Sequence, residues 1–277
     1  MTSVNLKAAE LQVSTSSDKY SYSLAVKEGV LFSWGNNFYG QLGLGDNSDR
    51  AYPTRVGPFS DWSAVSSGGG HSLGIRNGEL WGWGDNSEGQ LGLGSRVSHL
   101  SPVRIGNHSD WTHISAGEAH SCGIRGGLLF VWGLNNAGQL GTGDTITRLT
   151  PSRVGFIDDW TCVSAGWQHT LAIANGQLWA AGGNKCGQLG LGNRLGRRTF
   201  NRVGGRSDWT SVTAEGFTSS GILGGDIFVW GYNETGDLGL PDHEDVLHPT
   251  PKGGNLDWGR SDWINLLSAV SLYAPKD

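Results

Sequence analysis

The stretch W-G-N-N-F-Y-G-Q-L-G-L-G-D, from Trp34 to Asp46, decides the fold of this sequence. Its glycines could cradle a phosphate, but a P-loop needs Lys and then Ser or Thr after the last glycine, and neither is present. The dinucleotide-binding fingerprint needs G-x-G-x-x-G between a strand and a helix, whereas the order here is G-x-x-G-x-G. The turn returns every 49 residues, at Gly89, Gly138, Gly187 and, as G-D-L-G, Gly236. A turn that is made five times on a fixed period belongs to the architecture.

Other positions of the 49-residue unit repeat with the turn. One column is Asn in all five copies: Asn37, Asn86, Asn135, Asn184 and Asn233. Asn tolerates left-handed backbone and can bond to its own turn, so we interpret this column as a clamp on the turn. A second column is expected to anchor the turn in the core: Leu42, Leu91, Leu140, Leu189 and Leu238. A third column contains Pro in four copies and indicates an edge strand.

Each unit contains about four short β-rich runs with turn signals between them and no helical period. This pattern predicts an all-β fold, a β-propeller with five full blades plus a partial terminal one. The expected blades are residues 11–57, 58–106, 107–155, 156–204 and 205–253. Residues 254–277 are expected to close the ring with the N-terminus, so that 1–277 is a single propeller domain. The pattern leaves open whether the ring closes with five or six blades.

The pattern G-x-x-H-[ST]-x-x-[IL], then W-G-x-N-x-x-G-Q-L-G-x-G, then P-x-R-[VI] and D-W resembles the repeat of the regulator of chromosome condensation family. The resemblance covers residues 18 to about 240. It implies a β-propeller, usually of seven blades, from which this chain departs with five copies. The family's best-known activity is nucleotide exchange on a Ran-type small GTPase, with chromatin binding. As the resemblance implies it, exchange uses a wedge inserted between blades, and the strict 49-residue step leaves no room for one.

Composition limits the classes of partner. The chain has 277 residues and a net charge of −5, and nucleic-acid-binding proteins usually carry a basic excess, so no nucleic acid is expected. The start M-T-S-V-N-L-K has no apolar run typical of a signal peptide, and no stretch reaches the length of a membrane span. We therefore expect no membrane contact and a location inside the cell or in an assembled particle. The three Cys show no C-x-x-C spacing, so no metal and no cofactor are expected.

No residue set indicates an enzyme. His71, His120 and His169 share one phase of the repeat, so ring symmetry separates them around the axis, and we interpret them as structural. Two further columns are interpreted as Arg–carboxylate pairs within or between blades, with a charged ring at one mouth of the propeller as the alternative. The Arg column is Arg55, Arg104, Arg153 and Arg202, and the Asp column is Asp61, Asp110, Asp159 and Asp208.

Binding residues are sought where the sequence departs from its own repeat. The loop N-R-L-G-R-R supplies three such residues: Arg194, Arg197 and Arg198. The same loop of the next copy is acidic, with Asp242, Glu244 and Asp245. The two loops indicate either an exposed ion-pair network or a basic patch for a phosphate or an acidic partner. Trp167, in G-W-Q-H-T, also departs from the repeat, and this string resembles the plant ultraviolet-receptor branch of the family, although light sensing is the disfavoured interpretation.

The sequence favours a non-catalytic β-propeller scaffold for protein–protein interaction or a structural component of an assembly. That assembly would be a virus particle or of bacterial origin. Protein partners are expected, with a homo-oligomer or a larger assembly as the resulting form. Two alternatives stay open. One is a guanine-nucleotide exchange factor for a Ran-type small GTPase, and the other is an inhibitor that binds another protein's active site, as some bacterial propellers resembling this family do.

Overall fold

The computed structural model describes residues 11–16 and 21–252, which form five four-stranded antiparallel sheets. The innermost strands are β1 (Leu11–Thr15), β5 (Trp62–Ser67), β9 (Trp111–Ala116), β13 (Trp160–Ala165) and β17 (Trp209–Glu215). The second strands are β2 (Tyr22–Lys27), β6 (His71–Arg76), β10 (His120–Arg125), β14 (His169–Ala174) and β18 (Thr218–Leu223). The third strands are β3 (Val30–Gly35), β7 (Glu79–Gly84), β11 (Leu128–Gly133), β15 (Gln177–Gly182) and β19 (Asp226–Gly231). The outermost strands are β4 (Arg50–Arg55), β8 (His99–Arg104), β12 (Arg148–Arg153), β16 (Arg197–Arg202) and β20 (Val246–Pro251).

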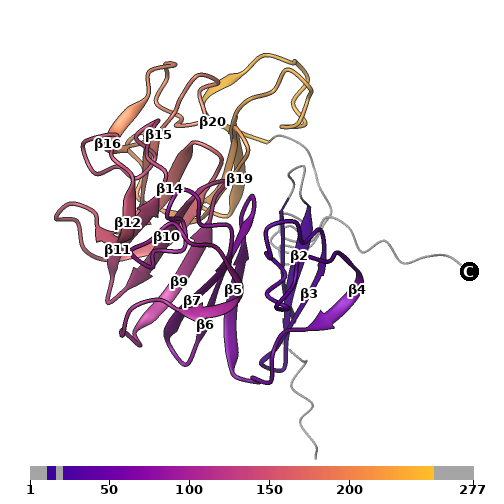
Figure 1. The fold of residues 1–277 in the computed structure, drawn as a ribbon. Coiled ribbons are helices and arrows are strands. Elements are labelled where there is room, and N and C mark those ends of the chain that lie inside the picture. Colours follow the sequence, from indigo (N-terminus) through magenta and orange to yellow (C-terminus); the bar gives the residue numbers. More distant parts are fainter. Residues whose placement is uncertain (1–10, 17–20, 253–277) are drawn as a thin grey trace, which may run out of the picture.

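The sheets are the blades of a β-propeller and follow one another in chain order around an arc (Figure 1). From the second blade to the fifth, the innermost strand packs against the two inner strands of the preceding blade, as β5 does against β1 and β2. Among the described residues, the first and fifth blades do not pack against each other in this way. The predicted all-β propeller with five four-stranded blades is confirmed, whereas the predicted closure by residues 254–277 and the N-terminus lies outside the described residues.

Short-range sequence explains the local geometry of each blade. The second and third strands meet in tight hairpins such as Asn77-Gly78, where both residues have positive φ, 51° and 72°. This is the backbone that a type I′ turn requires, and Asn-Gly adopts it readily. In the outer pair β7–β8 the register shifts between Gly82 and Gly84, close to Pro102. Pro lacks a backbone N–H and suits this irregular edge position, as the Pro column predicts.

The core lies between the blades and is built around tryptophans. Trp83 of β7 is fully buried, and its ring lies 5.8 Å from that of Trp62 at an angle of 67°. The fourth blade has Ala181 at the position of Trp83, and there Phe200 replaces the usual Pro. Phe200 packs 5.6 Å from Trp160, next to Ala181, so it fills the space that the missing indole leaves. A single position that breaks the repeat is therefore compensated by its neighbour in space.

Candidate functional site

The G-x-L-G turn is held by the Asn column, as predicted. In every blade the Leu backbone N–H donates to the Asn Oδ1, over 2.9–3.1 Å. The clamped Leu side chains are buried: Leu42, Leu91, Leu140, Leu189 and Leu238. The stretch that resembles a phosphate loop is thus a turn whose clamped Leu side chain faces the core.

This turn binds the next blade. The backbone carbonyl of Gln41 accepts two hydrogen bonds from the second blade, from Ser72 Oγ and from Trp83 Nε1, each over 2.8 Å. The carbonyls of Gln90 and Gln188 accept the corresponding pair. Gln139 accepts only the hydroxyl bond, because Ala181 supplies no indole. We call the hydroxyl and the indole N–H together the turn-binding site of a blade.

The His column is part of the same connection. His71 Nε2 lies 2.8 Å from Ser121 Oγ, and that hydroxyl donates its proton to Gln90 O. The imidazole must therefore carry its proton on Nε2 and donate it to the serine. His120 and His169 repeat the contact with Thr170 and Ser219, over 2.9 Å. These bonds join blades in pairs, which agrees with the structural interpretation of the column.

Burial sets the protonation state of these histidines. It lowers the pKa of His71 to about 4 and the pKa values of His120 and His169 to about 3. The negative charge of Asp85 partly offsets burial at His71. The Nδ1 atoms of all three rings have no hydrogen-bond partner among the described residues. The rings are therefore neutral near pH 7.

The predicted Arg–carboxylate pairs form only in part, and the Arg and Asp columns do not pair with each other. Arg104 binds Glu79 over 3.0 Å and Arg153 binds Asp158 over 2.8 Å. Arg55 donates to the backbone carbonyl of Pro58, over 2.8 Å, and binds no carboxylate among the described residues.

Asp61 instead pairs with Arg76 at the end of β6. The antiparallel pairing of β5 with β6 brings Arg76 to the start of β5, whereas Arg55 ends the outermost strand of the preceding blade. At Asp61, position across the blade selects the partner.

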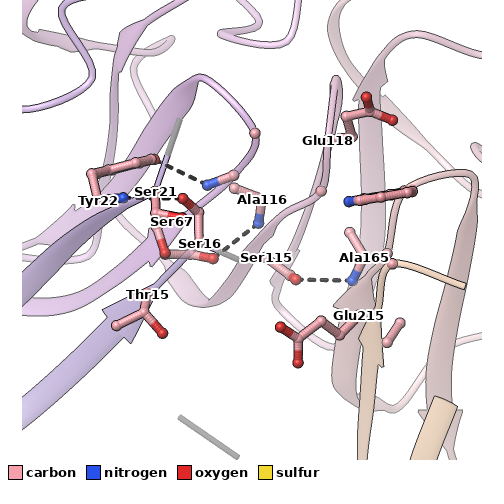
Figure 2. Close-up of a pocket in the computed structure, with 18 of the residues that line it drawn as sticks. Thr15, Ser16, Ser21, Tyr22, Ser67, Ser115, Ala116, Glu118, Ala165 and Glu215 are labelled. Atoms are coloured by element: carbon pink, nitrogen blue, oxygen red, sulfur yellow. Dashed lines mark hydrogen bonds between the residues drawn. The ribbon is translucent and has the colours of Figure 1, made fainter. Parts of the chain in front are cut away.

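The inner strands of all five blades end at one cavity of 650 Å³. Three serines at its wall accept a backbone N–H from the next blade: Ser66 from Ala116, Ser115 from Ala165 and Ser164 from Ala214, over 2.9–3.0 Å. Figure 2 shows the carboxylates of Glu118 and Glu215 on the side of the cavity opposite Ser21 and Tyr22. No site was predicted at this cavity from the sequence, although its serines recur every 49 residues, a signal that marks the propeller axis.

Trp167 lies at the wall of the same cavity. Its half-buried ring meets that of Phe217 edge-on at 5.1 Å, and its backbone N–H donates to Gly216 O over 3.1 Å. Trp167 therefore links the fourth blade to the fifth and also presents an indole to the cavity.

Of the three arginines in the basic loop, one forms an ion pair with a described carboxylate and two do not. Arg194 bonds to the carboxylate of Asp245 in the next blade over 2.6 Å, and this bond raises the pKa of the guanidinium. Arg197 donates only to the backbone carbonyls of Leu195 and Gly196. Arg198 is exposed, and no described carboxylate forms an ion pair with it.

The acidic loop does not complete the predicted network. Within residues 11–16 and 21–252, neither Asp242 nor Glu244 forms an ion pair with an arginine of the basic loop. The equivalents of Arg197 in the first and third blades, Arg50 and Arg148, do bind a carboxylate four residues earlier. Asn193 stands at that position in the fourth blade, which leaves Arg197 without one.

All three cysteines lie within the described part of the chain. Cys122, Cys162 and Cys186 are free thiols there, and burial raises the pKa of Cys122 to about 12. No group of three or more His, Cys, Asp or Glu side chains in this part is placed to hold a metal ion. The same residues include no helix with the length and apolarity to cross a membrane.

Models of a known repeat family match most of this chain. The model of the Regulator of chromosome condensation (RCC1) repeat matches residues 28–75, 77–124, 126–173 and 224–254. A second model of that description matches residues 62–90. A search of curated proteins gives no match.

Similar solved structures share the fold at low sequence identity. Human WBSCR16 is 23% identical with a TM-score of 0.76, over 84% of this chain and 65% of that one. Yeast RCC1 (Prp20), solved with Kap60, is 23% identical with a TM-score of 0.75, over 84% of this chain and 59% of that one. Prp20p from Saccharomyces cerevisiae is 23% identical with a TM-score of 0.73, over 84% of this chain and 61% of that one. This chain therefore spans less than two thirds of the length of these proteins.

Proposed function

Because this chain belongs to the Regulator of chromosome condensation (RCC1) repeat family, we propose that it acts as a non-catalytic propeller that binds protein partners or forms part of an assembly. One observation carries the proposal. The polar groups that recur with the repeat, such as His71, Ser121 and Gln90, bind one another between blades. They rigidify the propeller and leave the repeat without an activated nucleophile, which would need an adjacent base.

Residues outside the repeat then supply the binding surface. Arg194, Arg197 and Arg198 form a basic rim on the fourth blade, and the exposed side chain of Leu195 lies between them. Arg197 and Arg198 have no carboxylate partner among the described residues, so their charge is available to an acidic partner. Trp167 supports a second contact region, at the axial cavity.

The basic rim predicts binding to an acidic polypeptide. We expect the protein to bind immobilised poly-L-glutamate at low salt and R197S/R198S to elute at lower salt, because exposed charges are screened beyond about 8–10 Å at physiological ionic strength. The melting temperature should stay nearly unchanged. The control R96S/R206S removes equal charge from guanidinium groups that already bind carboxylates, and it should elute like the parent protein. Equal elution of both variants would contradict the assignment of the rim.

The second candidate function is nucleotide exchange on a Ran-type GTPase. Prp20p, one of the similar structures, is described with binding properties to Gsp1p and histones. The uniform blades argue against exchange here, since the links between them keep a 49-residue step with no inserted wedge. We expect the purified protein not to accelerate release of a fluorescent guanine nucleotide from a Ran-type GTPase. Accelerated release that a loop substitution abolishes would make exchange the better assignment.

A further inference from the structure

Three aliphatic side chains are exposed at one position of the repeat. Val97, Ile146 and Leu195 follow one another at the 49-residue step, in the loops before β8, β12 and β16, and they are 62%, 64% and 66% exposed. The same position holds Ser48 in the first blade and Glu244 in the fifth. The repeat therefore does not require an apolar residue there. We call Val97, Ile146 and Leu195 the apolar arc.

The Asn column holds the backbone of the apolar arc in place. The backbone carbonyl of each arc residue accepts a hydrogen bond from the Nδ2 of the Asn that clamps the turn of the same blade, over 2.9–3.2 Å. These Asn side chains are buried: Asn86, Asn135 and Asn184. The backbone is thus fixed at each arc position while the side chain is exposed. A partner that binds the arc therefore pays little conformational entropy to order these loops.

Hydrogen bonds between blades join the three loops into one surface. The Gly94 N–H, three residues before Val97, donates to Leu149 O of β12 over 2.8 Å. The Gly143 N–H, at the same position of the next loop, donates to Arg198 O of β16 over 2.7 Å. Each of these two loops therefore lies against the outermost strand of the next blade, directly after the next loop of the arc.

The surroundings of the arc carry a surplus of positive charge. The three loops and the starts of the strands after them contain five arginines and one aspartate, in residues 94–99, 143–148 and 192–198. Three of these arginines bind carboxylates of this chain: Arg96, Arg148 and Arg194. Arg197 and Arg198 bind none that the structure describes. Arg197 donates to Leu195 O over 2.9 Å, so its guanidinium lies beside the arc.

These features fit an acidic polypeptide better than an anionic membrane. Membrane sites that act through charge usually gather about four to eight Lys or Arg. Here only two of the five arginines lack a described carboxylate. A contiguous exposed apolar surface with a polar rim is typical of a protein-binding site. The surplus positive charge favours a partner segment that carries carboxylates.

We propose that the apolar arc and the basic rim together bind an acidic segment of a partner protein that also carries aliphatic side chains. Those side chains pack on Val97, Ile146 and Leu195, and the carboxylates bind Arg197 and Arg198. This inference rests on the proposed function. It adds that the partner must be apolar as well as acidic, and that the contact reaches from the second blade to the fourth.

Two fluorescent peptides of equal charge test the proposal, one with six Glu-Glu-Leu repeats and one with six Glu-Glu-Ser repeats. We expect the parent protein to bind the Leu peptide at least about tenfold more tightly, which corresponds to about 1.4 kcal/mol. V97S/I146S/L195S should lose this preference and keep its melting temperature, because the replaced side chains are exposed. The control F156S removes an aromatic ring that is 97% exposed beyond the other end of β12, and it should keep the preference.

Four outcomes would overturn the proposal. The parent protein binds the two peptides equally. V97S/I146S/L195S keeps the preference for the Leu peptide. The chain alone self-associates in gel filtration and this variant abolishes the association, which makes a second copy the occupant. The chain cosediments with phosphatidylserine vesicles and this variant abolishes the cosedimentation, which makes a membrane the occupant.

Poly-L-glutamate separates this proposal from the proposed function, because it has the charge of the partner without its aliphatic side chains. V97S/I146S/L195S should elute from it like the parent protein, whereas R197S/R198S should elute at lower salt. A parent protein that binds poly-L-glutamate through Arg197 and Arg198 but does not distinguish the two peptides would retain the basic rim and refute the apolar arc.

Discussion

Lowering the pH from about 7.5 to about 5 is expected to reduce the free energy of unfolding by about 6 kcal/mol, about 2 kcal/mol for each buried histidine of the His column. The unfolded chain binds protons near the ordinary histidine pKa of 6.5, whereas burial lowers the pKa of His71 to about 4 and those of His120 and His169 to about 3. Between these values only the unfolded state is protonated, so stability is lost as the pH falls from 6.5 towards the folded pKa values.

The structure explains why the folded state resists protonation. Each Nε2 already donates its proton to a hydroxyl of the next blade, so a second proton must enter at the buried Nδ1. No described acceptor faces that atom. Asp carboxyls, with an ordinary pKa of 3.8, stay ionised at pH 5 in both states and contribute little in this window.

Urea unfolding at the two pH values measures the effect. H71Q/H120Q/H169Q replaces the titrating rings by amides that can still donate a hydrogen bond, and its stability should change little with pH. The control H108Q, at an exposed histidine, should keep the full dependence. A parent protein equally stable at both pH values would show that burial does not control these rings.

Asn135→Ala is expected to destabilise the protein by about 3 kcal/mol, the upper range for leaving buried polar groups unpaired. The side chain of Asn135 is fully buried, and its Oδ1 accepts from the backbone N–H of Leu140 over 3.0 Å. Its Nδ2 donates to the carbonyls of Asp144 and Ile146 over 3.1 and 3.2 Å. Alanine removes these bonds and leaves the N–H of Leu140 buried without a partner.

Thermal unfolding tests this prediction. For a chain of this size, we expect the melting temperature of the variant to be lower than that of the parent by about 6–12 °C. The neighbouring Asn136 is exposed, and Asn136→Ala should change the melting temperature little. A neutral Asn135→Ala that nevertheless lost binding to a partner would make this column a binding site and not a clamp.

Sequence by itself determined the repeat and the local structure of each blade. The 49-residue period, the Asn and Leu columns and the edge Pro indicated five four-stranded blades, and these are present. This inference succeeds because hairpins, turns and edge strands depend on backbone preferences of adjacent residues. The bond from Asn135 Oδ1 to Leu140 spans five positions and is readable in the same way.

Only the tertiary structure decided which groups meet between blades. His71 binds Ser121, 50 positions away, and Trp83 binds the carbonyl of Gln41, 42 positions away. Within the second blade, Asp61 pairs with Arg76 and not with an arginine of the Arg column, because the pairing of β5 with β6 places Arg76 beside it.

Burial was likewise decided by the arrangement of the blades. Ser23 and Trp34 have the residue types of Ser72 and Trp83, and the sequence does not distinguish the two pairs. They differ because a preceding turn covers Trp83, whereas no described turn covers Trp34. Exposure, pKa and free hydrogen-bonding capacity depend on what lies against a side chain in space, and a periodic sequence repeats the side chain without repeating its surroundings.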